Sequence, residues 1–247
     1  MRVLLFITGF RHGKEYEYFN RFLARLKTLN EICDVFIYCN NPDISSDIVS
    51  YFRMFGQKNK HLHITSSNIG FVMGAVEAVS NGIEMGIFKD YDYAIHLHPD
   101  VFITAESKLV DLLIANLDND YVFLVNRSLP DDERFFSFDF FVFKPRLLKT
   151  NIFKDDLHGY GDIAEHYLSD MLARNHVKFK IVNRFGNDTW FPRRIDEHLN
   201  LYHEHDLGLV EALLSSLQTP NEQATVEVAR WQPPTVDLVP PQGGQKR

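Results

Sequence analysis

Cysteine is nearly absent from this sequence, whose 247 residues include only Cys33 and Cys39. Two thiols cannot form the disulfide framework of a small secreted domain, and by themselves they cannot supply the four ligands of a structural zinc site. We therefore expect reduced thiols in a cytoplasmic protein.

The sequence also lacks an excess of positive charge. Its 26 Lys and Arg residues are outnumbered by 33 Asp and Glu residues, which gives a net charge of −7. Non-specific binding to nucleic acid requires a basic face that neutralises phosphates, so we expect no nucleic-acid partner. A local binding site for an anion remains compatible with this balance.

Long apolar runs are missing as well. The longest run near the start of the chain covers Val3 to Ile7, whereas a membrane-spanning helix needs roughly 20 apolar residues. The run is also too short for the core of a signal peptide, and no small-residue cleavage site follows it. We expect neither a transmembrane segment nor a secretory signal.

What the sequence does contain is a regular alternation of strand-like and helix-like stretches. The strands are continuous apolar runs, and the helices show apolar residues at every third or fourth position. This alternation predicts a single α/β domain over residues 1–219, with a Rossmann-like, mostly parallel sheet and helices on both faces. The expected strands are Val3–Thr8, Val35–Cys39, Leu62–Thr65, Tyr93–His98, Tyr121–Val125, Phe138–Phe143 and Phe179–Val182, and the expected helices cover 15–29, 72–87, 107–117, 162–175 and 207–217.

The last part of the chain, residues 220–247, has a different composition. It holds five of the ten prolines, shows no periodicity and ends in PPQGGQKR. Such a segment cannot bury enough apolar surface to offset the entropy lost on ordering. We predict a disordered, flexible Pro-rich tail, with a docking peptide around Trp231 as the alternative.

The first strand leads into the sequence GFRHGK, which is a near miss to a phosphate-binding P-loop. Three residues separate Gly9 from Gly13 where that loop has four, and Glu15 stands where a Ser or Thr would hold magnesium. We therefore exclude a P-loop ATPase. We expect the glycines to shape a turn with Arg11, His12 and Lys14 at its mouth. These cations either help to hold a diphosphate or are simply exposed to solvent.

A second polar cluster follows the strand YAIHLH. The period of two in a strand places His96, His98 and Asp100 on one face, and Pro99 stops the strand just before Asp100. Ligands bind at the carboxyl ends of strands in open α/β sheets. One oxygen and one nitrogen ligand there suit Mn²⁺ or Mg²⁺, with zinc as an alternative.

Between Asn68 and Ile103 the sequence has an Asn-x-Gly-x-x-x-Gly segment, a helix of about 15 residues, and a strand YDYAIHL that leads into Pro-Asp-Val. This arrangement resembles the family 2 glycosyltransferases and their relatives with the GT-A fold. The resemblance implies a GT-A-like fold over roughly residues 1–205, a nucleotide-sugar donor and a divalent metal, Mn²⁺ or Mg²⁺.

Within this resemblance, Asp100 takes the second position of the family's D-x-D motif and His98 the first, where the family usually has Asp or Asn. The second strand also departs from the family, because it ends in Asn40-Asn41-Pro42-Asp43 rather than in an acidic turn. Asn40 or Asp43 could still meet the nucleobase or ribose. The expected donor-binding residues are Thr8, Gly9, Arg11, Asn40, Asn68, Gly70, His98 and Asp100.

The resemblance also implies a catalytic base at the start of a helix that follows the acceptor-side strand. Asp162 or Glu165 would fill this role, and Gly159 and Gly161 just before them give the backbone freedom of a loop that closes over an acceptor. The alternative is that the two acidic residues only cap the helix.

The sequence Leu201-Tyr-His-Glu-His-Asp206 ends the expected domain. Many GT-A enzymes place a late histidine on the metal or diphosphate, so the resemblance makes His203 and His205 candidate ligands beside His98 and Asp100. An isolated histidine is more often a surface or core residue, and that alternative stays open.

We therefore expect a metal-assisted glycosyltransferase that moves a sugar from a nucleotide-diphosphate donor to a hydroxyl of a glycan or other acceptor, in polysaccharide or glycan synthesis. Two alternatives remain. One is a non-catalytic domain that binds a nucleotide or sugar, and the other is a metal-dependent hydrolase that uses His96, His98, His203 and His205.

Overall fold

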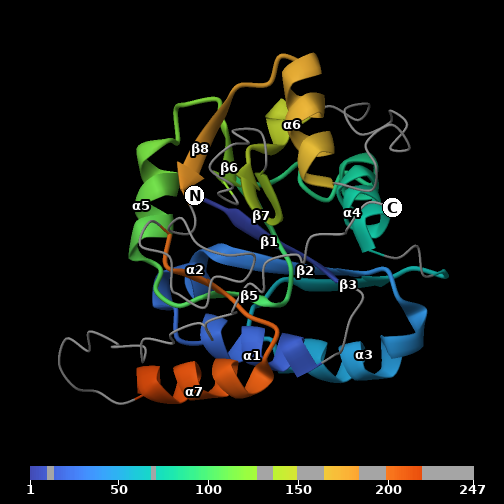
Figure 1. Ribbon diagram of the computed structural model, residues 1–247, viewed down its shortest axis with the longest axis vertical. Coiled ribbons are helices and arrows are strands. Elements are labelled where there is room, and N and C mark those ends of the chain that lie inside the picture. The colour runs from blue at the N-terminus through green and yellow to red at the C-terminus, as the bar shows by residue number, and fades with distance from the viewer. Residues whose placement is uncertain (10–13, 68–70, 127–135, 149–163, 184–198, 219–247) are drawn as a thin grey trace, which may run out of the picture.

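The computed structural model describes residues 1–9, 14–67, 71–126, 136–148, 164–183 and 199–218. These residues form a sheet with helices packed on both of its faces (Figure 1). The predicted tail, residues 220–247, lies outside the described residues, so its flexibility and the domain boundary at 219 stay predictions.

The main sheet has seven strands in the order β3-β2-β1-β4-β7-β6-β8, and a second small sheet pairs β5 with β9. Neighbouring strands are parallel except at β7, which is antiparallel to both β4 and β6. The expected mostly parallel α/β sheet is therefore confirmed. The strands are β1 (Val3–Gly9), β2 (Cys33–Cys39), β3 (Lys60–Ile64), β4 (Tyr93–Leu97), β5 (Val101–Ile103), β6 (Val122–Asn126), β7 (Phe136–Phe143), β8 (Phe179–Asn183) and β9 (Leu201–His203).

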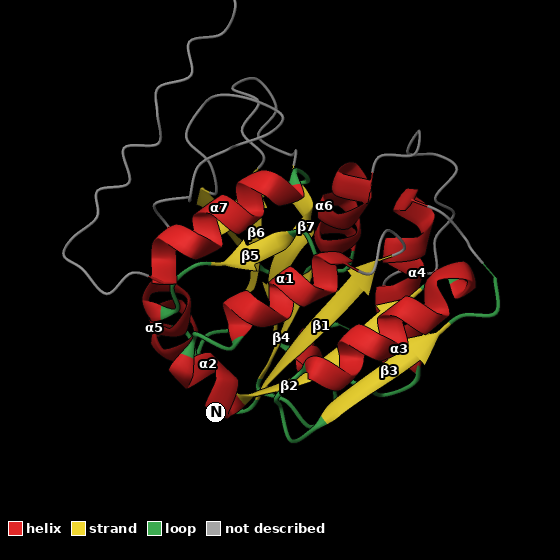
Figure 2. Ribbon diagram, turned by 90° about the horizontal axis from the view of Figure 1, so that it is seen from below, coloured by secondary structure: helices red, strands yellow, loops and turns green. Residues whose placement is uncertain are grey.

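The helices divide between the two faces of the main sheet. One face packs against α1, α3, α5 and α7, and the other against α4 and α6, as Figure 2 shows for α1 and α3 in front of the strands. The α-helices are α1 (Lys14–Leu23), α2 (Lys27–Ile32), α3 (Ser45–Met54), α4 (Phe71–Glu84), α5 (Ser107–Ala115), α6 (Ala164–Arg174) and α7 (Leu207–Gln218), and the 3₁₀ turns are η1 (Pro42–Ile44) and η2 (Pro145–Leu147).

Strand β1 lies in the middle of this arrangement. Its residues Val3 to Ile7 are all fully buried, with Leu5 packed on the α1 side and Phe6 on the α4 side. A strand covered by helices on both faces needs apolar side chains at every position, because neither face meets water. This explains the continuous apolar run with which the sequence begins.

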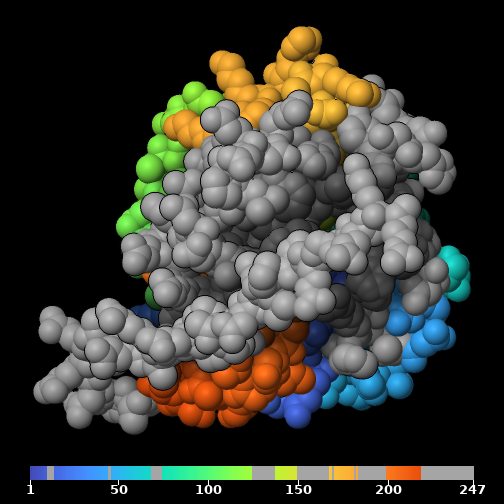
Figure 3. Space-filling view, viewed as in Figure 1, coloured from blue at the N-terminus to red at the C-terminus, as the bar shows by residue number. Residues whose placement is uncertain are grey.

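Helix α7, the last described helix, packs against α1, the first helix of the chain. Arg21 of α1 donates two hydrogen bonds to the Glu211 carboxylate, at 2.7 and 3.0 Å. In the space-filling view of Figure 3, the orange surface of α7 lies beside the blue surface of the first helix. The last described helix is thus held on the domain by apolar packing of Val210 and Leu214 and by this ion pair.

The predicted single helix over residues 15–29 is wrong, since the chain forms α1 and α2 with a turn between them. Leu26 has extended backbone angles (φ −93°, ψ 92°), which ends the helical path. Its amide hydrogen-bonds the Leu23 carbonyl at 2.9 Å, which closes the turn. The apolar periodicity continues through the break because Leu26 and Leu29 are both buried, so the sequence pattern conceals it.

Glu106, which precedes α5, caps the exposed start of α2. Its two carboxylate oxygens accept the backbone N–H groups of Thr28 and Leu29 at 3.0 and 2.8 Å. We expect Glu106→Ala to lower the free energy of unfolding by about 1 kcal/mol, as loss of a helix cap usually does. Urea unfolding at neutral pH measures the change, and Asp111→Ala, an exposed acidic residue of α5, is the matched control.

The same cap should make stability depend on pH. Burial by itself raises the pKa of Glu106, but the hydrogen bonds from Leu29 and Thr28 outweigh it and the pKa is lowered. A lowered folded-state pKa stabilises the protein above the unfolded pKa, about 4.3 for Glu, and this contribution is lost as the pH falls through the folded value. The difference in the free energy of unfolding between wild type and Glu106→Ala should therefore become smaller at acid pH.

Among the described helices, none is long and apolar enough to cross a membrane.

Candidate metal and donor site

The site lies where the order of the main sheet reverses. From β1, the chain places β2 and β3 on one side and β4 on the other, so the crevice outside the carboxyl ends of β1 and β4 is the expected ligand site. Thr8 and Gly9 end β1, while His98 and Asp100 follow β4. The structure thus brings the ends of these two strands, predicted separately, to one edge.

Asp100, His203 and His205 meet at this edge. The small sheet brings them together, because Val101 of β5 pairs with His203 of β9 although about a hundred residues separate them in the sequence. The Asp100 Oδ2 lies 2.9 Å from His205 Nδ1 and 3.6 Å from His203 Nε2. One ligand atom from each residue lies within 4.8 Å of the others, so the three can hold one divalent ion.

Burial and charge fit this interpretation. Asp100 and His203 are each 6 % exposed, and Asp100 Oδ1 has no hydrogen-bond partner within the described part of the chain. Burial by itself raises the pKa of Asp100, but the neighbouring imidazoles of His203, His205 and His98 outweigh it and hold the pKa well below its usual range. A buried carboxylate that stays ionised, with a free oxygen beside two imidazoles, is a suitable donor set for Mn²⁺ or Zn²⁺.

Glu204, between the two histidines, shapes the segment that carries them. Its Oε1 accepts the backbone N–H groups of His205 and Asp206 at 2.9 and 3.0 Å. Its own N–H donates to the Asp100 carbonyl at 3.3 Å. The Glu204 side chain therefore turns the chain after β9 so that His205 lies over Asp100.

His98 lies next to this group and contacts a different carboxylate. Its Nδ1 is 3.3 Å from Asp139 Oδ1, and the other oxygen of Asp139 is 3.8 Å from His203 Nδ1. Ser137 donates a hydrogen bond to that second oxygen at 3.0 Å. A carboxylate behind an imidazole orients the ring and fixes its tautomer, which is the usual support of a metal-binding histidine.

The sequence named Asp139 only as a substitute general base, to be considered after Asp162 and Glu165, and not as a partner of the site histidines. Asp139 is the one charged residue in the strand FSFDFFVF, whose other members are apolar except for Ser137. Its pairing with His98 and His203 depends on β7 running antiparallel beside β4, which the sequence did not reveal.

His96 does not belong to this group. It is fully buried, its Nε2 lies 2.8 Å from Thr8 Oγ1, and its ring stacks on Phe141 with centroids 4.6 Å apart. Burial lowers its pKa well below the usual range, so the imidazole is neutral. The four-histidine cluster of the hydrolase alternative is thus not formed in the described structure, because His96 is a core residue bonded to Thr8.

The predicted alternation along His96, His98 and Asp100 also needs correction. It ends at His98, because Pro99 and Asp100 form a turn that is closed by the Val101 N–H donating to the His98 carbonyl at 3.1 Å. This turn directs Asp100 toward β9, whereas the ring of His98 stays 5.5 Å from that of His96.

Asn40, one of the expected donor-binding residues, directly follows β2 and lies against Gly74 of α4. It is 4 % exposed, and its Oδ1 has no partner among the described residues. Its N–H donates to the Gly9 carbonyl at 3.4 Å, which links the ends of β1 and β2. Its amide nitrogen lies so close to Gly74 of α4 that a Cβ there would overlap it.

We therefore expect Gly74→Ala to displace Asn40 and to lower the free energy of unfolding by roughly 1–3 kcal/mol, as overpacking does. The higher helix propensity of Ala offsets this loss by up to about 1 kcal/mol. Urea unfolding and nucleotide titration of the same variant measure both consequences. Gly56→Ala is the control, because nothing lies within 4 Å of a Cβ at Gly56.

The remaining expected residues cannot be placed. Arg11, Asn68, Gly70 and Asp162 lie outside the described residues. Glu165 belongs to the first turn of α6, but its side chain is not described. Their predicted roles in donor binding and base catalysis stay predictions.

No family model matches this sequence, and no curated protein matches it significantly. Solved structures do share its fold. Mouse xyloside xylosyltransferase 1, in its apo form, matches 83 % of this chain and 98 % of its own, with a TM-score of 0.52 and 10 % identity. A mannosyltransferase from Pyrobaculum calidifontis, in complex with GDP-Man and Mn²⁺, matches 74 % of this chain with a TM-score of 0.51 and 10 % identity.

The chain spans about half the length of that mannosyltransferase, 55 %. Both similar structures are glycosyltransferases, so the likeness confirms the expected GT-A-like fold. Assignment to family 2 in particular stays a prediction.

Proposed function

We propose that this protein is a glycosyltransferase that moves a sugar from a nucleotide-diphosphate donor to a hydroxyl of a glycan or other acceptor, in polysaccharide or glycan synthesis. The observation that carries the proposal is the meeting of Asp100 with His203 and His205 at the carboxyl end of β4, in a fold shared with sugar transferases. One of those transferases was solved with a nucleotide sugar and Mn²⁺.

In this proposal Asp100, His203 and His205 hold a divalent ion, Mn²⁺ or Mg²⁺, with His98 beside them as a further ligand or a diphosphate contact. A bound divalent ion would neutralise the charge that develops on the diphosphate leaving group. Asp139 orients His98 and His203 by contacting the Nδ1 of each ring. Asn40 has a buried carbonyl oxygen without a partner among the described residues, which it could offer to a donor hydroxyl or base amino group.

The acceptor hydroxyl must lose a proton when it attacks the anomeric carbon, so a general base is needed. We assign this role to Asp162 or Glu165, which flank the start of α6. The position of Glu165 in the first turn of that helix is compatible with the assignment and also with simple helix capping.

A panel of UDP-, GDP- and dTDP-sugars with Mn²⁺ or Mg²⁺ tests the proposal through release of free nucleoside diphosphate. We expect one nucleotide class to be turned over and the turnover to stop with EDTA. Binding without turnover across a panel of acceptors would favour the non-catalytic binding domain. Absence of both binding and turnover for every nucleotide would contradict the proposal.

A further inference from the structure

A large cavity lies at the edge of the sheet opposite the metal site. Its volume is about 1030 Å³, and it is lined by residues that precede β4, residues that follow β7, and Leu117 after α5. Since Asp100 comes after β4 and this cavity lies before it, the strand separates the two. Five residues at about 3.3 Å each put the sites on the order of 15 Å apart.

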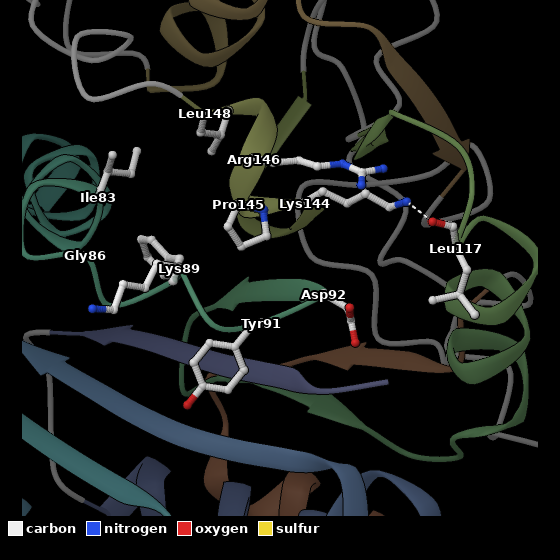
Figure 4. Close-up of a pocket in the computed structure, with 11 residues that line it drawn as sticks. Ile83, Gly86, Lys89, Tyr91, Asp92, Leu117, Lys144, Pro145, Arg146 and Leu148 are labelled. Carbon is white, nitrogen blue, oxygen red and sulfur yellow. Dashed lines mark hydrogen bonds between the residues drawn. The ribbon is translucent and has the colours of Figure 1, made fainter.

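Lys144 is a buried lysine in the lining of this cavity. It is 3 % exposed, and its ammonium donates a hydrogen bond to the Leu117 carbonyl (Figure 4). The ammonium also lies 5.2 Å from the centre of the Tyr93 ring. No carboxylate of the described residues forms an ion pair with it. Buried charges are normally paired, because removing a charge from water is costly.

Two of the acidic residues near Lys144, Asp92 and Asp120, already have partners. Asp92, which also lines the cavity, accepts the Arg2 N–H at 2.7 Å. Asp120 accepts the Arg146 Nε–H at 3.0 Å. Two more cations border the same space, Lys89 on one side and Arg146, which is ion-paired with Asp120, on the other (Figure 4).

The rest of the lining is mostly apolar. Ile83 and Phe88 come from the end of α4 and the loop after it, and Leu148 follows η2 on the other side. Ligand pockets typically combine such apolar walls with a few polar groups that fix orientation, in volumes of roughly 300–1,000 Å³. The composition therefore matches a ligand that is apolar at one end and negatively charged at the other.

We propose that this cavity is a second ligand site, which binds a small organic anion by its carboxylate or phosphate group on Lys144, with Lys89 and Arg146 at the rim and the apolar body against Phe88 and Leu148. This site is separate from the donor site and does not depend on the proposed transferase activity.

The test uses the full chain, ¹⁵N-labelled and free of divalent metal, titrated with phenyl phosphate, benzoate, inorganic phosphate and benzyl alcohol. We expect saturable shifts of the amides of Gly86 and Lys89 with phenyl phosphate or benzoate, with a Kd of about 1 mM or tighter. The ligand that binds more tightly, phenyl phosphate or benzoate, identifies phosphate or carboxylate as the anionic group that the site prefers. Benzyl alcohol lacks the charge and should leave these amides unmoved.

Lys144→Met should weaken binding at least about tenfold, as expected for a hydrogen bond to a charged group. If that variant does not fold, Lys89→Met combined with Arg146→Met removes the exposed rim charges and should weaken binding severalfold. Lys58→Met, an exposed lysine before β3, is the matched control and should bind like wild type. Asp100→Asn should also bind like wild type, which separates this site from the donor site.

Two results would overturn the proposal. One is the absence of saturable binding by either aromatic anion to the wild type. The other is binding that is unchanged in Lys144→Met or, if that variant does not fold, in the rim double variant.

Discussion

Asp100→Asn should abolish metal-dependent nucleotide binding. The substitution keeps the shape of the side chain and removes the charge that would bind the ion. Loss of a residue that only supports a metal ligand costs about 10–100-fold in affinity, so loss of a ligand itself should cost more than about 100-fold. Calorimetric titration of GDP and UDP in the presence of Mn²⁺ measures the effect.

The buried position of Asp100 affects how this experiment is done. From the sequence alone, a charge at a strand end should matter little to stability, but Asp100 is 6 % exposed and lies between two imidazoles. Removing one partner of a buried, hydrogen-bonded charge is destabilising. Binding should therefore be compared well below each unfolding midpoint, with Asp111→Asn on the surface of α5 as control. Wild-type affinity in folded Asp100→Asn would remove Asp100 from the metal site.

His203→Ala should have the next largest effect. His203 is buried between two carboxylates, with Asp100 Oδ2 3.6 Å from its Nε2 and Asp139 Oδ2 3.8 Å from its Nδ1, so burial restricts its ring before any ligand binds. We expect its loss to reduce Mn²⁺-dependent nucleotide affinity by at least about tenfold, with a smaller loss of metal-independent binding. Calorimetry with and without Mn²⁺ separates the two.

His205→Ala completes this comparison. His205 is closer to Asp100, at 2.9 Å, but its side chain is 33 % exposed, so it is held less firmly and its loss should cost less than that of His203. His61→Ala, on the edge strand β3, changes an exposed histidine far along the sheet and should leave binding unchanged. If neither His203→Ala nor His205→Ala changes the Mn²⁺ dependence, the metal does not bind on this segment.

Much of the main sheet could be predicted because its central strands are buried on both faces, which requires mostly apolar residues. β1 and β4 are buried on both faces, so β1 is a continuous apolar run and β4 is apolar except for His96. The turn residues around Pro42 and Pro99 mark where the chain leaves the sheet. Helix α3 was missed although Ile48, Tyr51 and Phe52 have the i, i+3, i+4 spacing of a helix, because the segment is only ten residues long and most of its other positions are serines or charged residues.

The assembly of the site could be predicted only in part. The resemblance to the GT-A enzymes named Asp100, His203 and His205 individually. Their meeting depends on β5 and β9, two strands of three residues each that are too short to give a periodic signal. The pairing of Val101 with His203 is a long-range contact, which local sequence patterns cannot specify.

His96 is the reverse example, because its spacing suggested a site residue and the structure makes it a core residue. Its spacing of two from His98 indicated a shared site, but the ring fills a space among Phe6, Phe138 and Phe141 and satisfies its Nε2 with Thr8. A buried neutral histidine and a metal ligand have the same spacing in a sequence. Only the position of the neighbouring aromatic rings distinguishes them.

The most direct test of the central claim is a crystal structure with Mn²⁺ and a nucleoside diphosphate, with anomalous scattering recorded to locate the metal. We predict a manganese peak within about 2.5 Å of an Asp100 carboxylate oxygen and of at least one imidazole nitrogen of His203 or His205, with the diphosphate on its open side. A manganese peak bound to the diphosphate but remote from Asp100 and both histidines would contradict the account.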